Sequence, residues 1–256
     1  MNEQTSKALV LRIGHFREID LWVRLLVPSL GIVTAFAFGG AKSRRRFCGC
    51  LDVLNTLSCR YTRAKHGDCY TLLEADLEAS AGDLRTNWRR MPMATNCLRF
   101  LEHVRVPPDN ADELFGFMEN FRNSLATNSA VASLFPFFFR FALACRLGYA
   151  PDFVRCGVCK ADLARETAVF VQNEGISLCK HCRHILAPGH LQIALPASVR
   201  WLLQGVRYSY PQAWSDAALS AVEKRLASDA IDGFLSYHLE ERQDPELRRV
   251  SCLGWS

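Results

Sequence analysis

Two short cysteine motifs lie close together in the second half of the chain, Cys156-Gly-Val-Cys159 and Cys179-Lys-His-Cys182, with nineteen residues between them. A Cys-x-x-Cys motif forms a tight turn that directs both sulfur atoms to one point, and two such turns can surround one metal ion tetrahedrally. We therefore predict that these four cysteines bind one zinc ion per chain. Because four thiolates fill the coordination sphere, the ion would have a structural role and no catalytic one. Two disulfides or unused thiols are the alternative.

The residues around the two motifs predict a small module of about residues 153–185. The stretch from 167 to 178 is typical of a short β-hairpin, with its turn at Asn173-Glu-Gly175. His181 lies inside the second motif and is an alternative ligand in place of one cysteine. Four cysteines at standard spacing favour the site with sulfur ligands alone.

The composition is that of an ordinary globular protein, because 49% of the 256 residues are hydrophobic and 22% are charged. The net charge of +5 permits an anionic partner without demonstrating one. The amino terminus has no basic segment followed by an apolar one, and the most apolar stretch, 131–145, is too short to cross a membrane. We therefore expect a cytosolic protein without a membrane segment, whose eleven cysteines form no disulfide framework.

Residues 7–80 have the pattern of a β-barrel. Turns separate five segments rich in β-branched and aromatic residues, which span 8–11, 19–27, 32–38, 52–62 and 70–75. Five short strands with a small connecting element fit a barrel of the OB type, and an SH3-like barrel is the alternative. We place an OB-fold domain at residues 1–80.

From residue 96 onward the apolar residues follow a helical period, which predicts a helical domain over 81–256 with the cysteine module inserted in it. The fold class is therefore α+β. Asn110 with Glu113 resembles a capping box at the start of one helix. The apolar stripe of that helix could line a ligand groove, but a place in the core is the favoured interpretation. The stripe consists of Leu114, Phe117, Met118, Phe121 and Leu125. Further helices are expected at 98–104, 131–147, 196–208 and 211–241.

A basic segment, Gly39-Gly-Ala-Lys42-Ser-Arg44-Arg-Arg46, follows the third predicted strand and carries four cations in five residues. A guanidinium group can bind two phosphate oxygens at once, so a flexible loop of this kind on the barrel is suited to binding DNA phosphates. A solvated loop that only improves solubility is the alternative. The predicted DNA-binding residues are Lys42, Arg44, Arg45, Arg46, Arg24, Arg63 and Lys65. Further cations of the barrel are Arg12, Arg17 and Arg60.

Aromatic residues of the barrel could stack on DNA bases, although Trp22 and Phe47 fit the core equally well. These residues are Phe16, Trp22, Phe47 and Tyr61. The sequence contains no Gly-x-x-x-x-Gly-Lys-Ser/Thr run, no nucleophile elbow and no His-Glu-x-x-His helix. Four aspartates could form a magnesium nuclease site, but their spacing gives no reason for them to converge. They are Asp20, Asp52, Asp68 and Asp76. The residues themselves therefore point to no catalytic site.

Four runs of sequence resemble the RecO family of bacterial DNA-repair proteins and recombination mediators, over nearly the whole chain. They are Ala8-Leu-Val-Leu-Arg-Ile-Gly-His-Phe-Arg-Glu-Ile-Asp-Leu21, Leu26-Val-Pro-Ser-Leu-Gly-Ile-Val-Thr-Ala-Phe-Ala37, Gly39-Gly-Ala-Lys-Ser-Arg-Arg-Arg-Phe-Cys-Gly-Cys-Leu51 and Phe139-Arg-Phe-Ala-Leu-Ala-Cys-Arg-Leu-Gly-Tyr-Ala-Pro151. The last run leads into the first cysteine motif. No single run is diagnostic, and the order and spacing of all four together are specific.

The resemblance implies an OB barrel, a helical domain and a zinc module that some family members lack. It also implies a non-enzymatic protein of the bacterial cytoplasm and nucleoid. Such a protein binds single- and double-stranded DNA, anneals complementary strands, and with RecR loads RecA onto strands coated by single-strand binding protein. The family's basic residues after the third strand correspond to Lys42, Arg44, Arg45 and Arg46, and its pocket for the tail of single-strand binding protein lies in the helical domain. Here Phe38-Gly-Gly40 departs from the basic or polar residue that is common before the loop.

A second hypothesis belongs to another class of function. The zinc module and helices could form a scaffold that binds only proteins, with the basic loop incidental.

Overall fold

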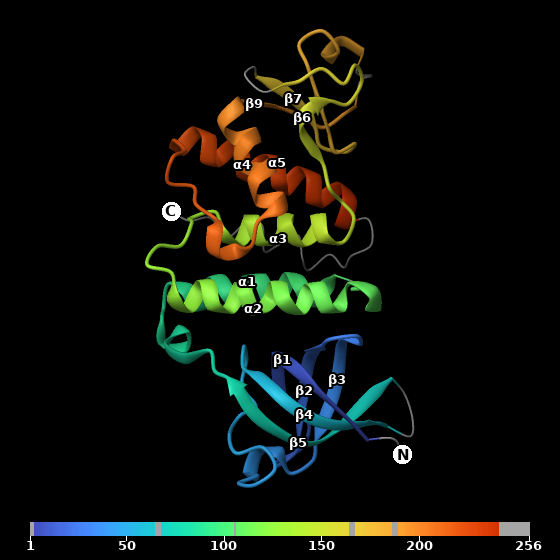
Figure 1. The fold of residues 1–256 in the computed structure, drawn as a ribbon, viewed down its shortest axis with the longest axis vertical. Helices are drawn as coiled ribbons and strands as arrows, with labels where there is room; N and C mark the ends of the chain where they lie inside the picture. The colour runs from blue at the N-terminus through green and yellow to red at the C-terminus, as the bar shows by residue number, and fades with distance from the viewer. Residues whose placement is uncertain (1–2, 65–67, 105, 164–166, 186–188, 241–256) are drawn as a thin grey trace. The chain divides into compact units, whose positions relative to one another are not determined.

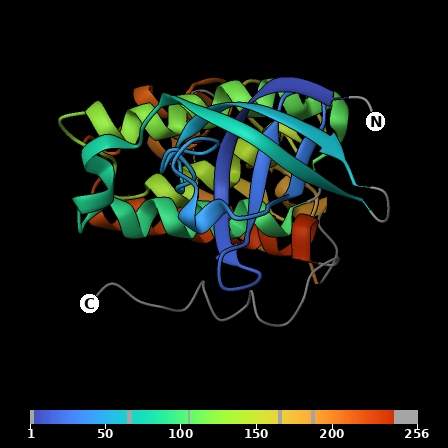
Figure 2. The ribbon, with the colours of Figure 1, turned by 90° about the horizontal axis from the view of Figure 1, so that it is seen from below.

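Five strands close into a barrel in the computed structural model, which describes residues 3–64, 68–104, 106–163, 167–185 and 189–240 (Figure 1). The strands are β1 (Glu3–His15), β2 (Leu21–Val27), β3 (Gly31–Ala37), β4 (Thr56–Arg63) and β5 (Cys69–Ala79). Their order is β1-β2-β3-β5-β4, and β4 pairs with β1 to close the barrel. Only the pairing of β3 with β5 is parallel. This arrangement confirms the predicted barrel of the OB type, and Figure 2 shows the strands crossing obliquely.

Alternation along each strand fills the barrel. On β2 the side chains of Leu21, Val23 and Leu25 point into the core, while Trp22 and Arg24 between them are only half-buried. This is expected because successive residues of a strand face opposite sides of the sheet. Outward-facing residues of β1, β2 and β3 are therefore available for contacts outside the barrel core.

Contact clustering divides the chain into two units. The first comprises residues 1–98 and 105–129, and so adds helix α2 (Ala111–Thr127) to the barrel. All five residues of the predicted apolar stripe on α2 are at most 3% exposed, so the stripe belongs to the core and does not line a groove. Arg122 of α2 is buried and donates from Nη1 to the hydroxyl of Thr56 on β4. Helix α1 (Arg90–His103) begins in this unit.

The second unit comprises residues 99–104 and 130–256 and is built from helices and a four-stranded sheet. Its helices are α3 (Phe135–Arg146), α4 (Ala197–Tyr208) and α5 (Ala221–Glu240). Its strands are β6 (Asp152–Cys156), β7 (Ala168–Val171), β8 (Ile176–Leu178) and β9 (Gln192–Leu195), in the order β6-β8-β7-β9. The hairpin β7–β8 turns at Gly175, whose φ of +66° favours glycine, as predicted. The sheet is larger than the expected hairpin because β6 and β9 extend it.

Four phenylalanines join the layers of this second unit. Phe141 of α3, Phe153 of β6, Phe170 of β7 and Phe234 of α5 are all at most 2% exposed. Their ring centroids lie 4.9–6.2 Å apart in tilted or edge-on pairs, which is the favoured geometry for aromatic packing. The sheet that carries the first cysteine motif is thereby packed against two helices.

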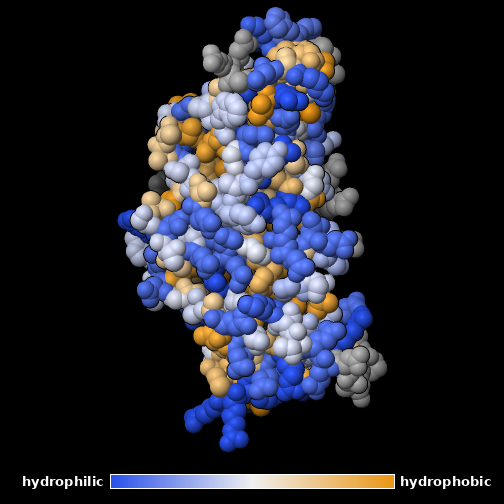
Figure 3. All heavy atoms as spheres, in the orientation of Figure 1, coloured by the Kyte–Doolittle hydropathy of each residue, from blue (hydrophilic) through white to orange (hydrophobic). Residues whose placement is uncertain are grey.

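Short 3-10 helices complete the described chain: η1 (Gly40–Lys42), η2 (Gly82–Thr86), η3 (Pro108–Asn110), η4 (Arg183–Ile185) and η5 (Pro211–Ala213). Among the described residues, no helix has the length and apolar character needed to cross a membrane. On the face seen in Figure 3, hydrophilic and hydrophobic residues are interspersed.

Candidate metal centre and nucleic-acid surface

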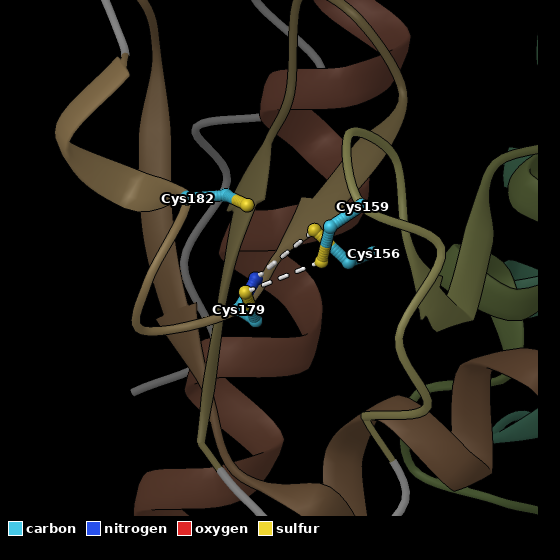
Figure 4. Close-up of side chains that lie close together, drawn as sticks. All are labelled: Cys156, Cys159, Cys179 and Cys182. Atoms are coloured by element: carbon cyan, nitrogen blue, oxygen red, sulfur yellow. Dashed lines mark hydrogen bonds between the residues drawn. The ribbon is translucent and has the colours of Figure 1, made fainter.

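The four predicted ligands converge on one point of the module. The sulfur atoms of Cys156, Cys159, Cys179 and Cys182 all lie within 4.8 Å of one another (Figure 4). The Sγ atoms of Cys159 and Cys179 are 3.8 Å apart. A tetrahedron with metal–sulfur bonds of about 2.3 Å has edges of about 3.8 Å, so this spacing fits a four-sulfur metal site. The group could therefore hold a metal ion.

Each motif is closed by backbone hydrogen bonds. In the first, the N–H of Lys160 donates to the carbonyl of Cys156 over 3.0 Å. In the second, the N–H groups of Cys182 and Arg183 both donate to the carbonyl of Cys179 over 3.1 Å. Gly157 is required sterically, because a Cβ atom there would lie 2.9 Å from the side chain of Ile176 on β8. The sheet therefore holds the two motifs against each other.

The thiols of the site ionise unequally. Burial acts to raise the pKa of Cys156, but the N–H groups of Cys179, Cys159 and Val158 donate to its sulfur and lower that pKa to about 6. Burial and the neighbouring sulfurs together raise the pKa of Cys182 to about 12. Four thiols this close cannot all lose their protons unless a cation offsets the negative charge. The donor set thus suits a soft, thiolate-binding divalent metal.

Two arginines of α4 hold the segment that leads to the first motif. Arg200 is 1% exposed, and its guanidinium donates to the carbonyl of Phe153 over 2.7 Å and to the carbonyl of Leu163. Arg207 donates to the carbonyl of Pro151 over 2.7 Å. Sequence reasoning missed both residues. An arginine between apolar neighbours on one helical face was the available signal for Arg200.

The basic loop after β3 is anchored at both ends. At its start, the N–H of Gly39 donates to the carboxylate of Asp20 over 2.7 Å, and Gly39 has a φ of +69°. At its end, the carbonyl of Arg46 accepts from the N–H of Ala75 on β5 over 2.8 Å, and Phe47 is 1% exposed. Phe47 therefore belongs to the barrel core, as does Tyr61 at 6% exposure.

The cations of this loop point into solvent. Lys42, Arg44, Arg45 and Arg46 are all exposed. Arg46 donates to the carbonyl of Phe38 over 2.5 Å, whereas within the described part of the chain the side chains of the other three form no hydrogen bond or ion pair. Hydrophilic side chains protrude in Figure 3 where Figure 1 draws the loops that follow β3. Three exposed cations on an anchored loop therefore form a positively charged surface.

The other predicted DNA-binding residues lie elsewhere on the barrel. Arg24 is half-buried on β2 and donates to the hydroxyl of Thr34 over 2.8 Å. Arg63 ends β4 opposite Tyr70 and forms an ion pair with Asp68 over 3.1 Å. Because the loop meets β5 at residue 75, five residues of β5 separate it from Arg63, or roughly 17 Å. Lys65 lies outside the described residues. The structure therefore does not bring Arg63 beside the loop.

Acidic partners neutralise the cations on β4 and the first half of β1. Arg60 forms ion pairs with Glu3 over 2.6 Å and with Glu74 over 3.0 Å. Lys7 is paired with Glu78 over 2.7 Å. The four aspartates of the hypothetical nuclease site do not gather, since the cysteines are the one group of potential metal ligands among the described residues.

Comparison with known proteins assigns the chain to a family. The family model for the N-terminal part of recombination protein O matches residues 1–81, and that for its C-terminal part matches residues 85–247. The chain belongs to the RecO family. The DNA repair protein RecO of Nitratidesulfovibrio vulgaris is 40% identical over 239 residues, which are 92% of this chain and 94% of that protein. RecO of Oleidesulfovibrio alaskensis is 38% identical over 236 residues, which are again 92% of this chain and 94% of that protein. RecO of Lawsonia intracellularis is 36% identical over 241 residues, which are 93% of this chain and 95% of that protein. The resemblance found in the sequence is confirmed.

Proposed function

We propose that this RecO-family chain is a DNA-binding recombination mediator that works without catalysis. It would bind single- and double-stranded DNA through backbone phosphates and anneal complementary strands. One observation carries the proposal: an anchored loop presents Lys42, Arg44 and Arg45 to solvent with no partner among the described residues, and Arg46 lies at its base. Arg24, Arg63 and Lys65 are proposed to extend the contact.

Phosphate contacts fit the chemistry of annealing. They are indifferent to base sequence, and they leave the base edges free to pair with a second strand. They also depend steeply on salt, because each contact releases counterions from the DNA. A mediator must let its DNA go, and several weak, flexible contacts allow that better than one rigid site does.

The metal and the partners complete the proposal. Zinc is the proposed ion of the four-cysteine site, where it would stabilise the module. The family resemblance supports RecR as a partner, the tail of single-strand binding protein as a ligand of the helical part, and RecA loading on coated strands as the outcome. The same resemblance supports a place in the bacterial cytoplasm, at the nucleoid.

A quadruple variant tests the loop. Changing Lys42, Arg44, Arg45 and Arg46 to alanine should weaken DNA binding by roughly 100-fold in fluorescence anisotropy, because each lost phosphate contact removes part of the electrostatic attraction. The variant should also fail to anneal oligonucleotides coated by single-strand binding protein at either of two salt concentrations. The double variant Lys7→Ala/Arg60→Ala is the matched control, since both cations already have acidic partners. Unchanged DNA affinity in the quadruple variant, with RecR still bound, would favour the protein-binding scaffold instead.

A further inference from the structure

The outer face of β1, β2 and β3 carries two rows of side chains that cross the strands. Pairing places Arg12 opposite Arg24 and Arg24 opposite Thr34. The next row along the strands contains Gly14, Trp22 and Phe36. The indole of Trp22 lies over Gly14, because a Cβ atom on that glycine would be 2.6 Å from the ring. A flat aromatic surface thus begins directly beside a row of cations.

Two more phenylalanines extend this row toward the basic loop. The ring of Phe16 contacts that of Phe36 edge-on at 5.1 Å, and the ring of Phe38 is stacked with Phe36 at 6.4 Å. Phe16 is 50% exposed and Phe38 is 45% exposed. We call Phe16, Trp22, Phe36 and Phe38 the aromatic face. Phe16 and Phe38 are exposed and both contact Phe36, and exposed rings that touch one another form the kind of apolar patch that marks a binding surface.

Cations border the aromatic face on both sides. The guanidinium of Arg12 lies 5.5 Å from the Trp22 ring, and that of Arg17 lies 5.2 Å from the Phe16 ring. On the other side, Arg46 of the basic loop donates to the carbonyl of Phe38. Neither β2 nor β3 contains an acidic residue, and the turn between β1 and β2 contributes Glu18 beside Asp20, which is bonded to the loop. The surface therefore combines flat apolar rings with flanking positive charge.

We propose that the aromatic face stacks one or two unpaired bases of single-stranded DNA while the basic loop holds the adjoining phosphates. This inference rests on the proposed DNA binding and adds a preference for unpaired strands. Every base has a π-face, so stacking is indifferent to sequence, and cations beside the rings match a polyanion. Stacking occupies the face of a base and leaves its pairing edge free, as annealing requires. A base inside a duplex cannot present its face.

The side of the barrel formed by β4, β5 and the first half of β1 has acidic residues beside its cations, which the aromatic face does not. There the outward cations Lys7 and Arg60 are paired with Glu78, Glu3 and Glu74, and a single large apolar residue of β5, Leu77, is 50% exposed. Carboxylates there would repel phosphates. That side supplies a matched control, since Leu77 has an exposed fraction like that of Phe16 and Phe38 but is aliphatic and has no ring to stack on a base.

The test removes the bases of the DNA strand and the aromatic rings of the protein independently of each other. Anisotropy is measured with a single strand of about 16 nucleotides, the same strand with its central bases replaced by abasic sites, and a duplex of equal length. Phe16→Ala/Phe38→Ala should weaken binding to the intact strand by roughly 10- to 100-fold, because each stacked base contributes strongly. Its affinity for the abasic strand and the duplex should match that of the wild type. Leu77→Ala should behave like the wild type on all three.

Two comparisons separate the possible failures. If the loop quadruple variant weakens all three complexes while the phenylalanine variant binds the intact strand normally, the stacking proposal is wrong and the proposed DNA binding stands. If the loop variant changes nothing, the proposed DNA binding fails first. In the wild type, 2-aminopurine in the strand should change its fluorescence on binding, and its silence at every position would also overturn stacking. This measurement decides the question even if the double variant does not fold.

Discussion

The four-cysteine module and the barrel surface differ in where their charged groups lie: the module encloses them, and the barrel surface exposes them to solvent. In the module, four sulfurs lie within 4.8 Å of one another, and Arg200 of α4 is buried against the carbonyl groups of Phe153 and Leu163. On the barrel, Lys42, Arg44 and Arg45 extend into solvent from an anchored loop. A closed set of ligands can stabilise a fold but offers nothing to a partner. Open cations contribute little to stability and are free to bind. Variants of the two regions should therefore change different properties.

The largest effect is expected at the metal ligands. Cys156→Ser should remove the bound metal and lower the unfolding free energy by on the order of 4 kcal/mol, because loss of a structural metal is among the few single changes of that size. Metal analysis should fall from about one zinc per chain to none, and the melting temperature should drop by roughly 10 °C. Cys69→Ser, at a half-buried thiol outside the module, is the control. DNA affinity measured below the melting temperature should be unchanged, and a loss there would place the module in DNA contact.

The salt dependence of DNA binding gives the next effect. The loop quadruple variant should reduce the slope of log affinity against log salt by about 3, since each phosphate contact contributes about 0.7 to 0.9. Its melting temperature should stay within about 2 °C of the wild type, because exposed cations contribute little to folding. Anisotropy titrations at four salt concentrations and a thermal melt provide both values. A slope equal to that of the wild type would show that the loop does not touch phosphates.

A smaller effect is expected at the link between α4 and the module. Arg200→Met keeps the volume but removes the donors to Phe153 and Leu163, and should cost roughly 2 to 3 kcal/mol in urea unfolding. Metal content should remain about one per chain, because no ligand is changed. Arg207→Met, at a half-buried arginine with one such bond, should cost less. If metal were lost in the Arg200 variant, the arginine would be shaping the site itself.

The smallest effect is expected at the paired cations of the barrel. Arg60→Ala removes two exposed ion pairs, and the free energy of unfolding in urea should stay nearly unchanged, because exposed pairs contribute little to stability. DNA affinity should stay within about twofold, because Glu3 and Glu74 already neutralise this arginine. A large loss of affinity would show that the whole barrel, and not the loop side alone, faces DNA.

Local sequence signals predicted the strands and helices well where their formation depends on residues that are neighbours in the chain. Turn residues and alternating apolar positions located the strands, and the helical period predicted a helix over 131–147, where α3 lies. The capping box was wrong in its chemistry: Asn110 is the N-cap of α2, but its side chain makes no capping hydrogen bond, because η3 runs directly into the helix. The extension of the hairpin into a four-stranded sheet also escaped prediction, since β6 and β9 pair with residues distant in sequence.

By itself the sequence determined the cysteine spacing, the presence of a five-stranded barrel and the family, because these depend on residues near one another in the chain or on the succession of local patterns along it. The tertiary structure alone decided which cations have partners. Arg60 and Arg46 look alike in the sequence, yet one is held by two carboxylates and the other lies beside Phe38. It also decided that Phe47 is core while Phe16 and Phe38 are exposed. Exposure and pairing depend on strand register, and register follows from closing the barrel.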